Sequence, residues 1–148
     1  RYLESKKFFT LKNIDLYIET VKEGYIRNIF NRNDLNKPFF FKIDIEGAEY
    51  RVLDELIEFQ DLICGLVIEF HDIDLHIQKI NDFIRSFNLV LTHIHPNNFG
   101  QKDKNGDPIV IELTFEKNPI ETNKDHVIPN MFDQPNNPDA KDIDLKFI

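Results

Sequence analysis

The sequence predicts one α/β domain: an open, mainly parallel sheet with crossover helices and a final antiparallel strand. Three apolar runs of strand length alternate with segments of helical periodicity, a pattern that favours parallel strands joined by right-handed crossovers. After the third run, a turn signal at 104–108 is followed at once by a last strand at 109–115. The connection is too short for a crossover helix, so this strand should run antiparallel to its neighbour.

The N-terminal part predicts a short strand at 8–11 and then a helix with apolar residues at helical spacing, namely Ile14, Ile18, Val21, Tyr25 and Ile29. The segment 31–38 is rich in Asn, Asp and Pro and predicts a loop. The run 39–45 is apolar on both faces except for Lys42 and Asp44, which favours a strand covered by helices on both sides. Its aromatic run Phe39-Phe40-Phe41 should lie in the core.

A tight turn at Gly47 and Ala48 should start a helix with an inward face made of Ala48, Val52, Leu53, Leu56 and Ile57. A second strand at 62–70 leads to a helix marked by Leu75, Ile80, Phe83, Ile84 and Phe87. The third strand, at 89–95, places His93 and His95 on one face. Beyond Lys117 the chain is polar and proline-rich, and we expect an extended tail over 118–148 that packs on the domain or stays mobile.

Composition narrows the classes of function. The 148 residues suit a single domain or domain fragment, and because the chain opens with Arg1 rather than methionine we expect a fragment or a processed product. Lys and Arg total 18 against 26 Asp and Glu, a net charge of -8, which argues against nucleic acid as a partner. No apolar run approaches the ~20 residues that span a bilayer. The single cysteine, Cys64, is expected to be a buried hydrophobe, and a cytoplasmic location without membrane contact is expected.

Polar residues gather where three of the predicted strands end. The first predicted strand carries Asp44, buried near its end, and is followed by Glu46 and Glu49. The second ends near Glu69 and leads to His71, and the third ends at His95 and leads to Asn97 and Asn98. In open α/β sheets, ligands bind at the carboxyl ends of the strands. The sequence therefore predicts a site with acid, base and amide groups at one edge of the sheet.

The motifs on these strands resemble a known family. They are Lys42-Ile43-Asp44-Ile45-Glu46-Gly47-Ala48-Glu49 with Val52-Leu53, then Leu66 to His71, and His93-Ile94-His95 before a hairpin that ends in Ile111-Glu112-Leu113. Over 38–117 the chain resembles the C-terminal half of a class I S-adenosylmethionine-dependent methyltransferase of the FkbM type. The resemblance implies strands four to seven of a Rossmann-like sheet. The resemblance also implies that the N-terminal strands of that sheet, with their Gly-rich cofactor turn, are not part of this chain.

The resemblance implies S-adenosylmethionine as cofactor, with Asp44 and Glu46 as its binding residues. The expected catalytic residues are Asp44, Glu69 and His71, with His71 as general base. We expect the acceptor, a small molecule or glycan, to contact Glu49, His95, Asn97 and Asn98.

Each assignment has a simpler alternative. Glu46 and Glu49 could serve only as favourable charges in a first helical turn, and Asp72 could cap a helix with His71 left at the surface. Asp44, Glu69 and His71 could instead bind a divalent metal. His93 is expected to be a satisfied core histidine, and His76 and His126 are expected at the surface.

Three functions follow from these residues. The first is methyl transfer to a hydroxyl of a sugar, glycan or secondary metabolite. The second is a metal-dependent phosphoesterase, since strand-end Asp, Glu and His also suit phosphodiester hydrolysis. The third is a non-catalytic half-domain, for which an exposed sheet edge would favour a homo-oligomer.

Overall fold

The computed structural model describes residues 24–120 and 128–145. It contains one four-stranded sheet in the order β1-β2-β4-β3, with bounds Phe39–Ile43 (β1), Ile63–Phe70 (β2), Val90–Pro96 (β3) and Ile111–Glu116 (β4). β1 and β2 are parallel, whereas β4 is antiparallel to both β2 and β3. The α/β class and the reversed last strand are confirmed. The expected parallel pairing of the second and third strands is wrong, because β4 lies between them.

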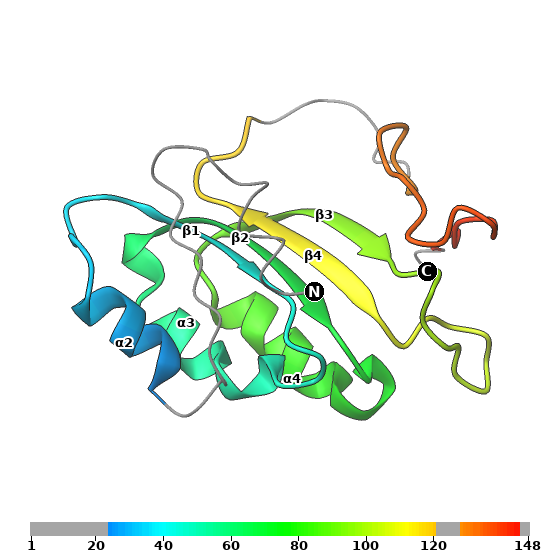
Figure 1. The fold of residues 1–148 in the computed structure, drawn as a ribbon, viewed down its shortest axis with the longest axis horizontal. Helices are drawn as coiled ribbons and strands as arrows, with labels where there is room; N and C mark the ends of the chain where they lie inside the picture. Colours follow the sequence, from blue (N-terminus) through cyan, green and yellow to red (C-terminus); the bar gives the residue numbers. More distant parts are fainter. Residues whose placement is uncertain (1–23, 121–127, 146–148) are drawn as a thin grey trace, which may run out of the picture.

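The α-helices of the described chain lie on one side of this sheet, as Figure 1 shows. They are α2 (Tyr25–Asn31), α3 (Leu53–Glu58) and α4 (Ile73–Ser86), and two single 3-10 turns, η1 (Glu49–Arg51) and η2 (Gln60–Leu62), flank α3. Residues from all four strands pack with the helices into one core, which includes Phe30, Leu56, Leu66, Ile68, Phe70, Ile80, Phe83, Leu113 and Phe115. None of the helices in the described ranges is long and apolar enough to cross a membrane.

The first strand is covered less completely than its sequence predicts. Phe39 and Phe41 pack against the core, each with its ring edge-on to Phe30, but Phe40 points to the other face and is 63% exposed. The prediction of helices on both faces of this strand, and of Phe40 in the core, is therefore wrong for the described residues. The Phe40 ring lies over Gly65 of β2, where an added Cβ would approach it to 2.7 Å. Gly65, which has no Cβ, therefore leaves room for the Phe40 ring to lie against the backbone of β2.

Several element boundaries differ from those predicted. β1 ends at Ile43 rather than at residue 45, and the chain after Gly47 forms the turn η1 before the six-residue helix α3. The predicted strand at 8–11 and most of the predicted first helix lie outside the described residues, and within them α2 begins at Tyr25 after Gly24, whose φ of 80° is left-handed.

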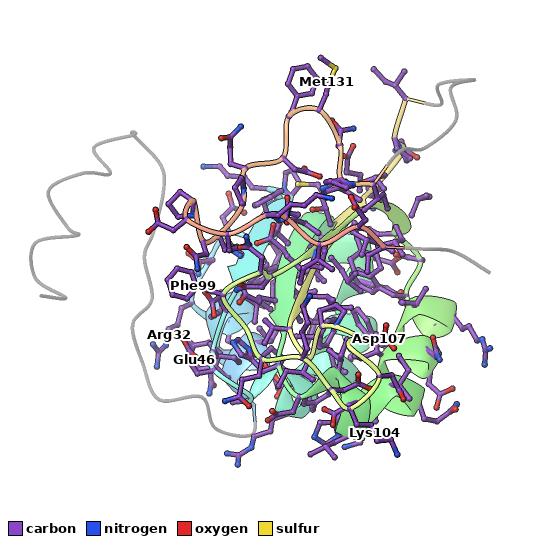
Figure 2. The ribbon with its side chains drawn as sticks, turned by 90° about the vertical axis from the view of Figure 1, so that its right-hand side faces the viewer. Arg32, Glu46, Phe99, Lys104, Asp107 and Met131 are labelled. Carbon is purple, nitrogen blue, oxygen red and sulfur yellow. The ribbon has the colours of Figure 1, made fainter. Side chains whose placement is uncertain are left out.

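The tail was expected either to pack on the domain or to stay mobile, and its described part packs on the domain. Residues 128–145 run beside the end of β3 (Figure 1), and Met131 points away from the domain at the tip of this segment (Figure 2). The His93 Nε2 atom lies 2.9 Å from Asp133 Oδ1, and His95 Nε2 lies 3.2 Å from Asp142 Oδ2. Asn98 accepts a hydrogen bond of 2.6 Å from the amide of Asn137. Side chains of β3 and the loop after it thus hold the tail.

Candidate functional site at the strand ends

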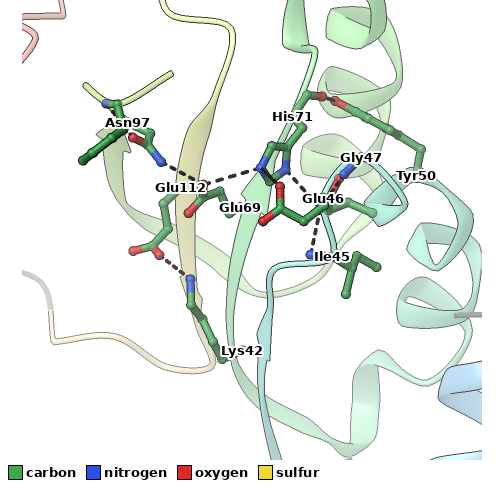
Figure 3. A network of polar contacts seen from close by, with 11 residues as sticks. Lys42, Ile45, Glu46, Gly47, Tyr50, Glu69, His71, Asn97 and Glu112 are labelled. Atoms are coloured by element: carbon green, nitrogen blue, oxygen red, sulfur yellow. Dashed lines mark hydrogen bonds and ion pairs between the residues drawn. The ribbon is translucent and has the colours of Figure 1, made fainter. Parts of the chain in front are cut away.

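His71, the first residue after β2, is surrounded by three carboxylates (Figure 3). Its Nδ1 atom lies 3.2 Å from Glu49 Oε1, while Nε2 lies 3.5 Å from Glu46 Oε2 and 3.7 Å from Glu69 Oε1. The imidazole side chain is 17% exposed. His71 is therefore part of a polar cluster, and the alternative that leaves it at the surface is wrong.

Glu49, the first residue of η1, anchors the cluster. Its side chain is fully buried, and Oε1 accepts hydrogen bonds from the amides of Ile45 at 3.0 Å and Gly47 at 3.2 Å. The second oxygen, Oε2, is also buried but has no hydrogen-bond partner. Buried carboxylate oxygens normally have partners, because desolvating one without compensation is costly.

The backbone between β1 and η1 is shaped to present these amides. Glu46 and Gly47 both have positive φ angles, 54° and 92°, and form a left-handed turn. Glycine adopts this conformation at little cost, whereas glutamate rarely does. A strained non-glycine residue of this kind is typical of functional sites.

Tyr50 holds the backbone of His71 in place. Its hydroxyl donates a 2.6 Å hydrogen bond to the backbone carbonyl of His71 (Figure 3). Burial raises the pKa of Tyr50, and the nearby charges of Glu49, Asp72 and Asp74 raise it further. Tyr50 therefore stays protonated and remains a donor over the whole physiological pH range.

Asn97 extends the cluster to the third strand. Its Nδ2 atom donates a 2.9 Å hydrogen bond to Glu69 Oε1, and its Oδ1 atom accepts one from the amide of Phe99. Glu112 of β4 lies opposite Glu69 of β2 in the sheet register, but its carboxylate pairs with Lys42 of β1. The loop after β3 thus places an amide side chain against the acid of β2.

The structure brings together most of the predicted site. Glu46, Glu49, Glu69, His71 and Asn97 are connected by contacts, as expected for strand ends at one edge. Asp44 lies close by, because single ligand atoms of Asp44, Glu49 and His71 are within 4.8 Å of one another. The expectation that Asp44 is buried in a strand is wrong, since the strand ends at Ile43 and Asp44 is exposed.

Two predicted acceptor residues have other partners. His95 pairs with Asp142, and Asn98 donates hydrogen bonds to the carbonyls of Asn137 and Ala140, so both hold the tail. Asp72 occupies the N-cap position of α4, as the alternative expected, but its side chain makes no cap hydrogen bond.

The remaining singled-out residues have structural surroundings. His93 is half-buried and paired with Asp133, in line with a satisfied histidine. His76 is half-buried against the Tyr50 ring rather than at the surface, with ring centroids 4.0 Å apart, and His126 lies outside the described residues. Cys64 is half-buried rather than buried, and its thiol donates to the carbonyl of Phe39.

Two features of the site escape reasoning from sequence. Glu49 was expected to contact the acceptor, but it is the buried anchor of the loop, and Tyr50 was not singled out at all. The signal for Glu49 was its position directly after the Gly47-Ala48 turn, where a first-turn acid can accept hydrogen bonds from free backbone amides.

The arrangement can move a proton. If Glu49 accepts from the Nδ1–H group of His71, the Nε2 atom is left with a lone pair that can accept a proton from a hydroxyl or amine. Two further carboxylate oxygens lie near this Nε2 atom, Glu46 Oε2 at 3.5 Å and Glu69 Oε1 at 3.7 Å. Glu49 with His71 is the pairing of an orienting acid with a histidine base that proton-transfer sites use.

Comparison with known proteins gives one short similarity. No family model matches the chain, and no solved structure matches it. An ATP-dependent helicase, Lhr-Core protein 2 from Thermococcus barophilus, is 44% identical to this chain over 45 residues. The match covers 30% of this chain, and the chain spans about 5% of the length of that helicase. So short a match identifies no family.

Proposed function

We propose that this chain is the acceptor-side half of an S-adenosylmethionine-dependent methyltransferase that methylates a hydroxyl of a sugar, glycan or secondary metabolite. The observation that carries the proposal is the polar cluster around His71, at the ends of β1 and β2. It lies on the segments whose motifs resemble FkbM-type enzymes.

The sheet supports the same proposal. The resemblance implies that the last strand of the fold is antiparallel, and β4 is antiparallel to both of its neighbours. β1 has a partner on one side only within the described residues. In the proposed enzyme, its other side would continue into the cofactor-binding strands.

The proposed chemistry assigns a role to each group. Methyl transfer is an in-line displacement, so the acceptor oxygen must be aligned with the sulfonium methyl and must lose its proton. His71 would accept that proton, with Glu49 orienting the ring. Glu69, held by Asn97, and the exposed Asp44 and Glu46 would hydrogen-bond the acceptor and the cofactor.

The test is calorimetric titration of S-adenosylhomocysteine, in the presence of EDTA, into this chain and into a form extended at its N-terminus. The proposal expects the extended form to bind. Asp44→Asn should weaken that binding, whereas Asp74→Asn, the same change on an exposed first-turn residue of α4, should not. Failure of the extended form to bind the cofactor product would contradict the proposal.

A metal-dependent phosphoesterase is the second candidate. The observation that favours it is the grouping of Asp44, Glu49 and His71, which are residue types that bind hydrolytic metals. It expects turnover of an aryl phosphate with added divalent metal and without any methyl donor.

A further inference from the structure

We infer that Asp44, Glu49 and His71 form a binding site for a first-row transition dication such as Mn²⁺, Co²⁺ or Zn²⁺. The inference goes beyond methyl transfer, because these three residues would bind the cation with no methyl donor present. It also differs from the trio expected from sequence, since Glu49 takes the place of Glu69.

The first argument is geometric. One ligand atom from each of the three residues lies within 4.8 Å of the other two. Ligand atoms about 2.1 Å from a metal can be at most ~4.2 Å apart. In a tetrahedral site such atoms lie ~3.4 Å apart, so the widest pair of the trio would have to close by up to about 1.4 Å around an ion. Asp44 is exposed and can supply that movement without disturbing the core.

The second argument is the unpartnered oxygen of Glu49. The Oε2 atom is buried and has no hydrogen-bond partner, in a side chain that is 0% exposed and belongs to the trio. Its sister oxygen already accepts from two backbone amides and faces His71. A cation beside Oε2 would compensate its lost hydration, which none of its described neighbours does.

The third argument is the balance of charge. Within the described residues, every ion pair of Glu46, Glu49 and Glu69 is made with His71. The nearest lysine of the sheet, Lys42, is already paired with Glu112. One imidazole thus faces an excess of carboxylates, and a dication would offset it.

The ligand types choose the class of cation. Carboxylate oxygens alone suit Mg²⁺ or Ca²⁺, but an imidazole nitrogen in the set favours transition dications. Three protein ligands also leave coordination positions open for water or for an oxygen of a bound molecule, as in catalytic metal sites.

The test uses the full chain, cleared of metal with EDTA and dialysed, and titrates Co²⁺ and Mn²⁺ by calorimetry without any methyl donor. The wild-type chain should bind Co²⁺ at a single site, and bound Co²⁺ should shift the ring protons of His71 in the NMR spectrum. Asp44→Asn should weaken binding by at least about tenfold, since outer-shell changes alone cost about 10–100-fold. This variant should keep the wild-type circular dichroism spectrum, because Asp44 is exposed.

Two matched variants make the result decisive. Asp74→Asn removes an equally exposed carboxylate outside the cluster and should leave Co²⁺ affinity within about threefold of wild type. Glu69→Gln should weaken Co²⁺ binding less than Asp44→Asn does, because Glu69 contacts His71 but is not in the trio. The inference is overturned if the wild type does not bind, if Asp74→Asn weakens binding as much as Asp44→Asn, or if only Glu69→Gln removes binding. Loss of cofactor-product binding with Co²⁺ binding intact would reject the methyltransferase proposal and keep this one.

Discussion

At the scale of single residues, the site depends on the left-handed turn at Glu46 and Gly47. This turn directs the amides of Ile45 and Gly47 toward the buried Glu49. Glu49 in turn lies against His71, so a change in the backbone of the turn would alter the position of His71 through the Glu49 side chain.

We expect Gly47→Ala to lower the free energy of unfolding by about 1–2 kcal/mol, the cost of the left-handed conformation for a residue with a Cβ. The cost is conformational, because an added Cβ would meet Asp72 only at 4.0 Å. Gly106→Ala is the control, since Gly106 has φ +88° and nothing within 4 Å of an added Cβ. Urea unfolding should show similar losses for both variants, and only Gly47→Ala should weaken Co²⁺ binding. Equal Co²⁺ affinities would contradict a role for the turn in the site.

Tyr50 gives a prediction that depends on pH. Its pKa is raised above the ordinary tyrosine value of 10.0, first by burial. Its contribution to stability is therefore fully present below the pKa of the unfolded state and is lost as pH rises through the higher pKa of the folded state. In the folded state, wild type and Tyr50→Phe should therefore show the same tyrosinate absorbance up to about pH 11, because Tyr50 stays protonated at a pH where an ordinary tyrosine has largely ionised.

The control is the same titration in urea, where wild type has four tyrosines and the variant three, so their absorbances should differ. Tyr50→Phe should also cost about 1 kcal/mol, because the carbonyl of His71 loses its hydrogen bond. Equal loss of tyrosinate in folded and unfolded protein would show that Tyr50 is not shielded.

At the scale of elements, β3 joins the sheet to the tail. His93 and His95 share a face of the strand, with their rings 6.4 Å apart, and each binds an aspartate of the tail. The two pairs lie nine residues apart in the tail, at Asp133 and Asp142, so they attach it at both ends of the described segment.

We expect Asp142→Ala to loosen the tail while leaving the sheet intact, because the change removes the partner of His95 and nothing in the core. Hydrogen exchange should rise over 137–145 and stay unchanged in β2 and β4. Asp139→Ala is the control, since it removes the same charge from an exposed tail residue. Equal effects of the two variants would mean that charge, rather than the pairing with His95, controls the tail.

At the scale of the whole molecule, one core joins the helices to one face of the sheet. Leu66 is fully buried at the centre of this core, opposite Phe41 of β1 and Phe115 of β4. Truncating it leaves a cavity bordered by three strands and their helices.

Leu66→Ala should therefore lower the free energy of unfolding by about 2–5 kcal/mol, measured by urea denaturation. The matched control is Leu75→Ala on α4, where the leucine is 73% exposed and the loss should stay within about 0.5 kcal/mol. A Leu66→Ala variant as stable as the control would contradict the position of the core.

Local patterns in the sequence determined the class of the fold and part of the site. Strand and helix periodicities, with the turn before residue 109, predicted α/β architecture and a reversed last strand, and both are observed. The spacing of Glu69 and His71 placed both on one face at a strand end, where they lie 3.7 Å apart. These predictions succeeded because they depend on backbone geometry within a few residues.

Only the tertiary structure decided the order of the strands and the partners of individual side chains. It placed β4 between β2 and β3, left Phe40 exposed, buried Glu49 instead of Asp44, and paired His95 with Asp142 of the tail. Each of these outcomes depends on contacts between residues far apart in the chain, or on the conformation of the loop after β1. Periodicity does not encode such contacts, because it reports which face a residue occupies and not what lies opposite that face.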